Sequence, residues 1–428
     1  MSQFSSSPRS IQRRHFLKTT VGAGLLAGWM TSCQDEGNAH QTDPPSVAVS
    51  RQPMMLQEIK EAFYDDVIID RLEVVRVEKA GGLEFVRAYS TDGAIGIIPA
   101  SPELKYLMPI FQALILPFFK GRNALDIESL IDEIYRHASN YTFAGMPFWT
   151  CVAHAELAIL DMLGKVAARP VADFFGSSLR KKIPVYLSTF DRVSSAEAYI
   201  DQIQQAIEGT YIRAVKLQIG GQMSNNADCL PGRTEKLIPL ARKALGDDFT
   251  LYVDANGSYD ADKAIEIGQL LQDHGVALFE EPCPWQDVVA TKAVSDRLSM
   301  DIGGGKQNSS LHQFAHLMNE GVVNLIQPNV HHVGGFIRSL RIVRMAEQAG
   351  LSVSFPNPGI GPSNAYMLHL ASICSNMGPF QEFRPDTYPE GIYFPATIVE
   401  FGKLTASLGA GWGIGYDSQI WPNMKVLS

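Results

Sequence analysis

The sequence predicts an α/β protein with a (β/α)8-type, TIM-like barrel and an α+β capping domain. The main observation is a run of eight short apolar segments between residues 183 and 383. They recur every 20 to 35 residues or so, with amphipathic stretches between them, and parallel strands need connections of about that length. The expected barrel strands are Ile183–Leu187, Ala214–Leu217, Thr250–Val253, Val276–Phe279, Met300–Ile302, Val322–Ile326, Leu351–Ser354 and Gly378–Phe383.

The segment before the barrel has a different order of elements. Residues 67–98 favour an antiparallel meander that turns at Asp92-Gly93. Three stretches with helical apolar spacing follow, namely Leu104–Phe119, Ile127–Ser139 and Cys151–Ala168. Strands followed by helices predict an α+β domain over residues 66–182. Because an eight-stranded barrel is complete at Phe383, we expect residues 384–428 to pack back on this first domain.

Residues 1–33 are basic and then apolar. The paired Arg13-Arg14 precede the apolar run Val21–Met30, and the first acidic residue is Asp35. This pattern is typical of a twin-arginine export signal, and the apolar run is too short for a membrane anchor. A basic surface helix is the other interpretation. Small residues before Cys33 leave open whether this cysteine is removed on cleavage or kept as a lipid anchor, so we expect a periplasmic protein or a membrane-anchored lipoprotein.

Composition limits the class of protein and of partner. The 428 residues are 46% hydrophobic and 19% charged, which is typical of a globular chain. The net charge is −9, and it becomes −13 without the four basic residues of the leader (32 basic against 45 acidic groups), so we expect no nucleic-acid partner. Residues 34–65 include Asp43-Pro44-Pro45-Ser46 and have little apolar periodicity, which predicts a flexible tether.

Polar residues lie at or just after the ends of six of the expected barrel strands. In such barrels the carboxyl ends of the strands and the loops after them hold the active site. The polar residues at these ends are Lys216, Gln218, Asp254, Asn256, Glu280, Glu281, Lys306, Asn329 and Glu382. One of them alone could cap a helix, but polar groups at six strand ends that face one opening predict a binding or catalytic site.

The motifs around these residues resemble those of the enolase superfamily, in its mandelate racemase/muconate lactonizing enzyme-like branch, from about Asp66 onward. They follow the order known in that family: Lys216–Gly221, Val253–Gly257, Phe279–Pro282, Gly303–Gln307, Gln327–Asn329 and Gly334-Gly335. The resemblance implies a capped barrel, a small hydroxy-carboxylate or acid-sugar ligand, and abstraction of the proton α to its carboxylate. It also implies an Mg²⁺ ion that stabilises the enolate, and a homo-oligomer.

The resemblance also implies roles for individual residues. Asp254 and Glu280 match the first two metal ligands, and two carboxylates suit Mg²⁺. Lys216 matches a lysine that contacts the substrate carboxylate, and Glu382 matches an acid that can hydrogen-bond the enolate. Together with Asn256 and Asn329, Lys216 and Glu382 form the expected substrate-binding set, and the expected catalytic set is Lys216, Lys306 and Glu382.

Three positions depart from the family pattern. Lys306 stands where the third acidic metal ligand is usual, Gln218 where a lysine base is usual, and Asn329 where the Asp of a His–Asp dyad is usual, with no histidine in Ser354–Asn357. We hypothesise that the Lys306 ammonium replaces the ion, because Asp254, Glu280 and one lysine carry the same total charge as three carboxylates with Mg²⁺. Two functions stay open: an isomerase or lyase with Lys306 or Lys216 as base, and a catalytically silent binding protein.

Overall fold

The computed structural model describes residues 46–49, 56–356, 361–385, 388–407 and 409–428. The expected export signal and Cys33 lie outside these residues, as does most of the expected tether. Within the described part, no helix is both long enough and apolar enough to cross a membrane.

Eight parallel strands form the barrel, as the sequence predicts. They pair in the order β10-β9-β8-β7-β6-β5-β4-β11. A parallel bridge between Val353 and Met377 and a 3.1 Å hydrogen bond from Ser354 Oγ to the Phe380 carbonyl close the ring between β10 and β11. The strands are β4 (Lys182–Ser188), β5 (Ala214–Gln218), β6 (Thr250–Asp254), β7 (Val276–Glu280), β8 (Asp301–Gly304), β9 (Leu325–Ile326), β10 (Ser352–Val353) and β11 (Gln381–Phe383).

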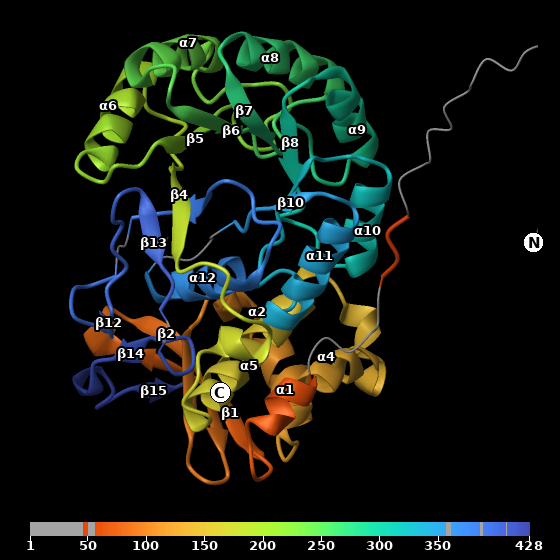
Figure 1. Cartoon of the computed structure of the whole chain (residues 1–428), viewed down its shortest axis with the longest axis vertical. Coiled ribbons are helices and arrows are strands. Elements are labelled where there is room, and N and C mark those ends of the chain that lie inside the picture. The colour runs from red at the N-terminus through yellow and green to blue at the C-terminus, as the bar shows by residue number, and fades with distance from the viewer. Residues whose placement is uncertain (1–45, 50–55, 357–360, 386–387, 408) are drawn as a thin grey trace, which may run out of the picture. The chain divides into compact units, whose positions relative to one another are not determined.

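Helices connect these strands along the outside of the barrel (Figure 1). They are α6 (Ala196–Ile207), α7 (Arg233–Leu245), α8 (Ala261–Asp273), α9 (Val288–Arg297), α10 (Leu311–Asn319), α11 (Phe336–Gln348) and α12 (Asn364–Ile373). Side chains cap several of them: Asp260 accepts from the Lys263 amide at the start of α8, and Ser310 and Gln313 form a capping box on α10. With helices outside and packed side chains inside, every residue of β5 is buried.

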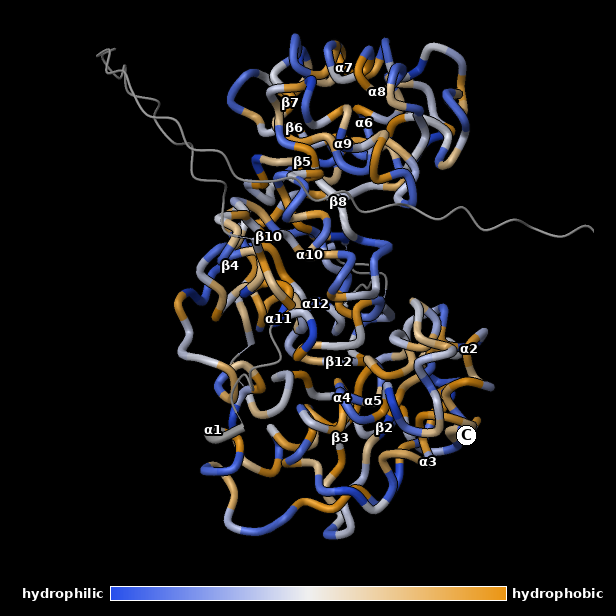
Figure 2. Tube along the Cα trace, turned by 90° about the vertical axis from the view of Figure 1, so that its right-hand side faces the viewer, coloured by the Kyte–Doolittle hydropathy of each residue, from blue (hydrophilic) through white to orange (hydrophobic). Residues whose placement is uncertain are grey.

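The capping domain is a three-stranded antiparallel meander covered by helices. Its elements are β1 (Ile69–Val77), β2 (Leu83–Ser90), β3 (Ile95–Pro99), α2 (Leu104–Ile110), a π-helical turn (Phe111–Ile115), α3 (Leu116–Phe119), α4 (Ile127–Arg136) and α5 (Met146–Val166). The long helix α5 packs on β2 and β3 and is buried over most of its length. Figures 1 and 2 show these elements together at one end of the described unit, with β5–β8 at the other. The predicted barrel with an α+β cap is therefore confirmed.

The C-terminal segment joins both domains. Its strand β15 (Lys425–Val426) extends the cap sheet by pairing with β1, and β13 (Lys403–Thr405) pairs with barrel strand β4. A short antiparallel pair, β12 (Tyr393–Phe394) with β14 (Gly415–Tyr416), lies beside the cap in Figure 1. Trp412 anchors the segment, because its indole N–H donates to the Leu157 carbonyl of α5 at 2.9 Å. Packing on the cap was expected, and the contact with β4 is additional.

The chain before Asp66 differs from the expected tether. Helix α1 (Leu56–Glu61) lies within residues 34–65, its Ile59 is buried in the main core, and Lys60 forms a 2.9 Å ion pair with Asp126. Further upstream, the amide of Val47 donates to Asn319 Oδ1 at 2.7 Å, and Asn319 Nδ2 donates back to the Val47 carbonyl at 3.1 Å. A helix of six residues is too short for apolar periodicity to reveal, which is why the sequence did not predict it.

The contact of β3 with α5 makes a stability prediction. A Cβ on Gly96 would lie 2.0 Å from the Ala158 carbonyl oxygen and 2.6 Å from the Met162 amide nitrogen, both in the backbone of α5. We expect Gly96→Ala to lower the free energy of unfolding by about 3 kcal/mol, because helix and sheet must separate to admit the methyl group. Urea denaturation measures the change.

The matched control is Gly176→Ala. Its Cβ would meet no atom closer than 3.8 Å, so we expect it to leave stability unchanged or to raise it by less than about 1 kcal/mol. Equal stability of the two variants would contradict the close approach of β3 to α5.

Candidate functional site

The carboxyl ends of the barrel strands bring one lysine and three acids into contact. Strand register aligns Gln218 with Asp254, and Asp254 with Glu280, at the ends of β5, β6 and β7. Lys216 Nζ lies 2.8 Å from Glu280 Oε2, 3.2 Å from Glu382 Oε1 and 4.0 Å from Asp254 Oδ2. All four side chains are at most 1% exposed. The structure thus gathers four of the residues that the sequence placed at the site.

These contacts keep Lys216 protonated. Burial alone would lower the pKa of the Lys216 amine, but the negative charges of Glu280 and Glu382 outweigh it and raise the pKa well above its ordinary value. A general base works best with a pKa near the operating pH. The protonated Lys216 amine is therefore suited to binding negatively charged groups, and it is a poor proton acceptor.

Amide side chains hold the acids in place. Glu280 Oε2 also accepts from Gln327 Nε2 at 2.7 Å, whereas Glu280 Oε1 has no hydrogen-bond partner among the described residues. Asp254 Oδ1 accepts from the backbone amide of Asn256 at 2.8 Å, and Asp254 Oδ2 accepts from Asn256 Nδ2 at 2.9 Å. Asn256 has a φ of 43°, a left-handed conformation that turns its amide toward the acid. Burial, opposed by Lys216, raises the pKa of Glu280.

Lys306 faces the same acids without touching them. It follows β8 in a loop that is fixed by a 2.8 Å hydrogen bond between His332 Nδ1 and the Lys306 carbonyl. In the described part of the chain, no carboxylate oxygen lies within 4.0 Å of its amine nitrogen. Burial opposes its charge, but attraction by Glu382, together with Glu280 and Asp254, raises the pKa of Lys306 above its usual value. The cation in direct contact with the acids is Lys216, and Lys306 adds a second positive charge nearby.

This donor set does not fit a magnesium ion. Mg²⁺ prefers octahedral oxygen coordination, but the third ligand position is an ammonium, and both oxygens of Asp254 are already bonded to Asn256. Glu280 Oε1 is the one orphaned oxygen of the two matched ligands. Among the residues that the structure describes, no group of three or more His, Cys, Asp or Glu side chains could hold a metal ion.

Arg192 is a site residue that the sequence interpretation missed. It lies in the loop after β4, is 8% exposed, and its Nη2 donates to Gln218 Oε1 and to Asn256 Oδ1. Its Nε donates to the Ile219 carbonyl at 3.2 Å. A guanidinium thus covers the position where the family has a lysine base. The only sequence signal was an arginine close after a strand end, which many surface loops share.

Asn329 mainly orders the loop after β9. It is fully buried, and its Oδ1 accepts from the backbone amides of His331 at 3.0 Å and His332 at 3.4 Å. His331 packs against His154 with ring centroids 4.9 Å apart. Burial lowers the pKa values of both His331 and His332. Histidine is therefore present beside Lys306, but no His–Asp dyad exists among the described residues.

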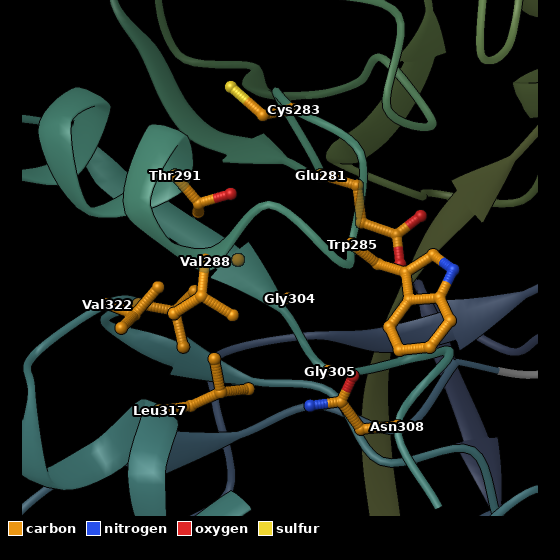
Figure 3. A pocket seen from close by; sticks show the side chains of 12 residues that line it. Glu281, Cys283, Trp285, Val288, Thr291, Gly304, Gly305, Asn308, Leu317 and Val322 are labelled. Atoms are coloured by element: carbon orange, nitrogen blue, oxygen red, sulfur yellow. The ribbon is translucent and has the colours of Figure 1, made fainter. Parts of the chain in front are cut away.

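Glu281 is the remaining acid at this edge. It has a φ of 43°, is 7% exposed, and its Oε1 has no hydrogen-bond partner in the described structure. Burial, reinforced by the charge of Asp254, raises the pKa of Glu281 to about 7. Glu281 and Cys283 both line a small cavity of about 30 Å³, which has room for a water molecule, and in Figure 3 the carboxylate and the thiol point in different directions.

The Lys216 contacts predict a pH-dependent loss of stability. We expect Lys216→Met to lower the free energy of unfolding by about 3–5 kcal/mol near neutral pH, because Glu280 and Glu382 would stay buried without their cation. Without the lysine these carboxylates are protonated more readily in the folded state, so the folded variant binds more protons than the unfolded chain and regains stability as the pH falls. Urea denaturation across acidic and neutral pH measures this. Lys120→Met, at an exposed lysine, is the control, and a deficit that does not change with pH would contradict the prediction.

For Glu281, in contrast, we expect removal of the charge to raise the free energy of unfolding. Its pKa rises from 4.5 to about 7 on folding. The wild-type protein therefore becomes more stable as the pH falls through 7, and this gain in stability is complete below pH 4.5. We expect Glu281→Gln, which mimics the protonated acid, to be more stable than wild type by about 3 kcal/mol at pH 8 and equal to it near pH 4. Urea denaturation at both pH values checks this. Glu208→Gln, on the surface, should show no difference, and a Glu281→Gln variant weakened at pH 8 would contradict the prediction.

Comparison with known proteins places this chain in a family. The family model described as Enolase C-terminal domain-like matches residues 198–420, just over half of the 428-residue chain. The D-galactonate dehydratase family member of Catenulispora acidiphila is 26% identical over 375 residues, covering 79% of this chain and 84% of that protein. The D-gluconate dehydratase of Thermoproteus tenax is 23% identical over 310 residues, covering 71% of this chain but 61% of its own length.

A solved structure has the same fold. The mandelate racemase/muconate lactonizing protein of Paracoccus denitrificans PD1222, complexed with magnesium, is 23% identical and aligns with a TM-score of 0.78 over 85% of this chain and 99% of its own. The chain's homologues thus include acid-sugar dehydratases, and one neighbour in fold binds the ion that the donor set here does not fit. This chain belongs to the enolase superfamily, in its mandelate racemase-like branch.

Proposed function

We propose that this protein binds a small hydroxy-carboxylate or acid sugar at the barrel mouth without a magnesium ion and without abstracting a proton from it. The observation that carries the proposal is the buried contact of Lys216 with Glu280 and Glu382, with Lys306 at the third ligand position. The ligand class comes from the relatives, which include a D-gluconate dehydratase and a D-galactonate dehydratase family member.

The chemistry of α-proton abstraction supports this choice. The reaction needs a base and a strong positive centre beside the enolate. Both lysines have raised pKa values and stay protonated, and Gln218 cannot accept a proton in place of a lysine. In contrast, groups that bind an anion remain, because Arg192 has no carboxylate partner within 4.0 Å among the described residues and Lys306 faces the same opening.

A second candidate is an isomerase or lyase, and one observation favours it. Glu281 combines burial, an unpartnered oxygen and a pKa of about 7, which suits a general base at neutral pH. In that case the charges of Lys216 and Lys306, with Glu382 as hydrogen-bond donor or acceptor, would replace the ion at the enolate.

Hydrogen exchange separates the two candidates. The protein is incubated in D₂O with D-gluconate and D-galactonate, with and without added Mg²⁺, and the signal of the α-hydrogen is followed by NMR. We expect calorimetric binding of at least one acid sugar and no exchange beyond that of the uncatalysed solution, because Lys216 and Lys306 stay protonated and Gln218 cannot accept a proton. Exchange that Glu281→Gln abolishes would establish the second candidate instead. Arg192→Gln should weaken binding about tenfold or more, as expected for the loss of a charged hydrogen bond.

Metal content tests the replacement of the ion. We expect the purified protein to contain far less than one Mg²⁺ per chain by elemental analysis. Lys306→Glu restores a third carboxylate, so we expect it to gain a divalent-ion site in calorimetry. Lys306→Met removes the charge without adding a ligand and should gain none. Stoichiometric magnesium in the unmodified protein would contradict the proposal.

We also propose that residues 1–33 export the protein by the twin-arginine route. The supporting observation is the sequence pattern of Arg13-Arg14 before the apolar run. Replacing both arginines with lysine should leave the protein in the cytoplasm, as fractionation and immunoblotting would show. In the otherwise unmodified protein, Cys33→Ala tests lipidation. The variant would leave the membrane fraction if Cys33 carries lipid, and its distribution between fractions would not change if Cys33 carries none.

A further inference from the structure

A second cavity lies outside the barrel mouth, between cap helices α4 and α5 and barrel helices α10 and α11. Its volume is about 370 Å³, which is in the range of small-molecule sites. The polar and aromatic residues that line it include Asp132, Arg136, Trp149, Ser309, Arg338 and Arg341. None of the residues assigned to the mouth lines it.

Arg338 is a buried cation without an acidic partner. It is 6% exposed, and its guanidinium lies over the Trp149 ring at 3.6 Å. Its Nη2 donates to the Ser309 carbonyl at 2.8 Å and its Nε to the Val333 carbonyl, but no described carboxylate lies within 4.0 Å. Burial and the charge of Arg341 lower the pKa of Arg338 to about 9. Buried charges in proteins are normally paired, but Asp132 and Glu156 act on Arg338 only from a distance, so this guanidinium lacks a counter-charge in direct contact among the described residues.

The rest of the lining does not supply that counter-charge. Asp132 is the acid that lines the cavity, and it is already bonded to Arg341 at 2.6 Å and 3.0 Å. Glu128 accepts from the same arginine at 3.2 Å. Arg136 is exposed at the rim and forms no hydrogen bond or ion pair with the described residues. Three guanidinium groups and one carboxylate therefore face a single cavity, in a chain whose net charge is −9.

The start of α10 adds to this positive field. Ser309 and Ser310 line the cavity, and Ser310 caps this nine-residue helix. The amino end of a helix carries a partial positive charge, which favours anions. Arg338 Nη1 forms no hydrogen bond with the described residues and is left for a ligand.

We infer that this cavity is a binding site for a small organic oxyanion, a carboxylate or a phosphate monoester, that is separate from the barrel mouth. Arg338 contacts the oxyanion from the buried side, Arg136 from the rim, and the serine hydroxyls at the start of α10 complete the polar contacts. The planar guanidinium suits carboxylate and phosphate oxygens equally.

The test measures thermal stability and calorimetric binding of the whole protein with two probes. Inorganic phosphate serves one arm and benzoate the other, each against chloride at equal ionic strength. We expect a saturable rise in Tm with at least one probe and none with chloride, and the arm that saturates identifies the oxyanion. Arg338→Gln should weaken this binding about tenfold or more, since a charged contact is lost. Lys306→Met, at the mouth, should leave it unchanged.

Three results would overturn the inference. The first is the absence of saturation with both probes. The second is unaltered binding in both Arg338→Gln and Arg136→Gln. The third is binding that Lys306→Met removes while Arg338→Gln does not. Because Arg338 also bonds two backbone carbonyls, its variant requires circular dichroism to establish folding. If it does not fold, Arg136→Gln decides, since that exposed side chain has no bond to lose, and we expect a loss of affinity of about twofold to fivefold.

Discussion

The need to neutralise buried carboxylates governs this end of the barrel. Parallel strands place their carboxyl ends together, so Asp254, Glu280 and Glu382 meet in a region with almost no solvent. An ionised carboxylate costs several kcal/mol to bury unless a cation or several donors compensate it. Lys216 compensates two of the acids, Glu280 and Glu382, directly. Asn256 donates to both oxygens of the third, Asp254, and Gln327 donates a further hydrogen bond to Glu280.

A covalently attached cation differs from a bound ion in two physical respects. It is always present, so the pocket does not depend on ion concentration, and it carries one charge on a flexible chain where Mg²⁺ carries two in rigid coordination. The first property suits a site that holds an anion. The second weakens the stabilisation of an enolate, whose charge develops on two oxygens. Lysine at position 306 and glutamine at position 218 are thus both consistent with the proposed binding of an anion without proton transfer.

The sequence predicted the barrel because its strands are continuous apolar runs, and the parallel order then placed Lys216, Asp254, Glu280 and Glu382 at one opening. It could not predict Arg192, whose contact with Gln218 depends on how the loop after β4 folds back. Nor could it show that Lys216 contacts the acids while Lys306 stands farther away, since Lys216 lies on strand β5 but the position of Lys306 depends on the loop after β8. The helix α1 and strand β13 were missed because elements of six and three residues carry too little periodicity.

The pairing of β15 with β1 has a consequence for synthesis of the chain. The amide of Val74 donates to Ser428 Oγ at 2.8 Å, across 354 residues of sequence. On a translating ribosome, which adds about 5–20 residues per second, β1 would wait roughly 20–70 s for this neighbour. Until then one edge of the β1–β2–β3 meander has unpaired amide and carbonyl groups, which favour aggregation with other nascent chains. Completion of the cap is therefore a late event, and a chaperone that covers this edge would protect the growing polypeptide in the meantime.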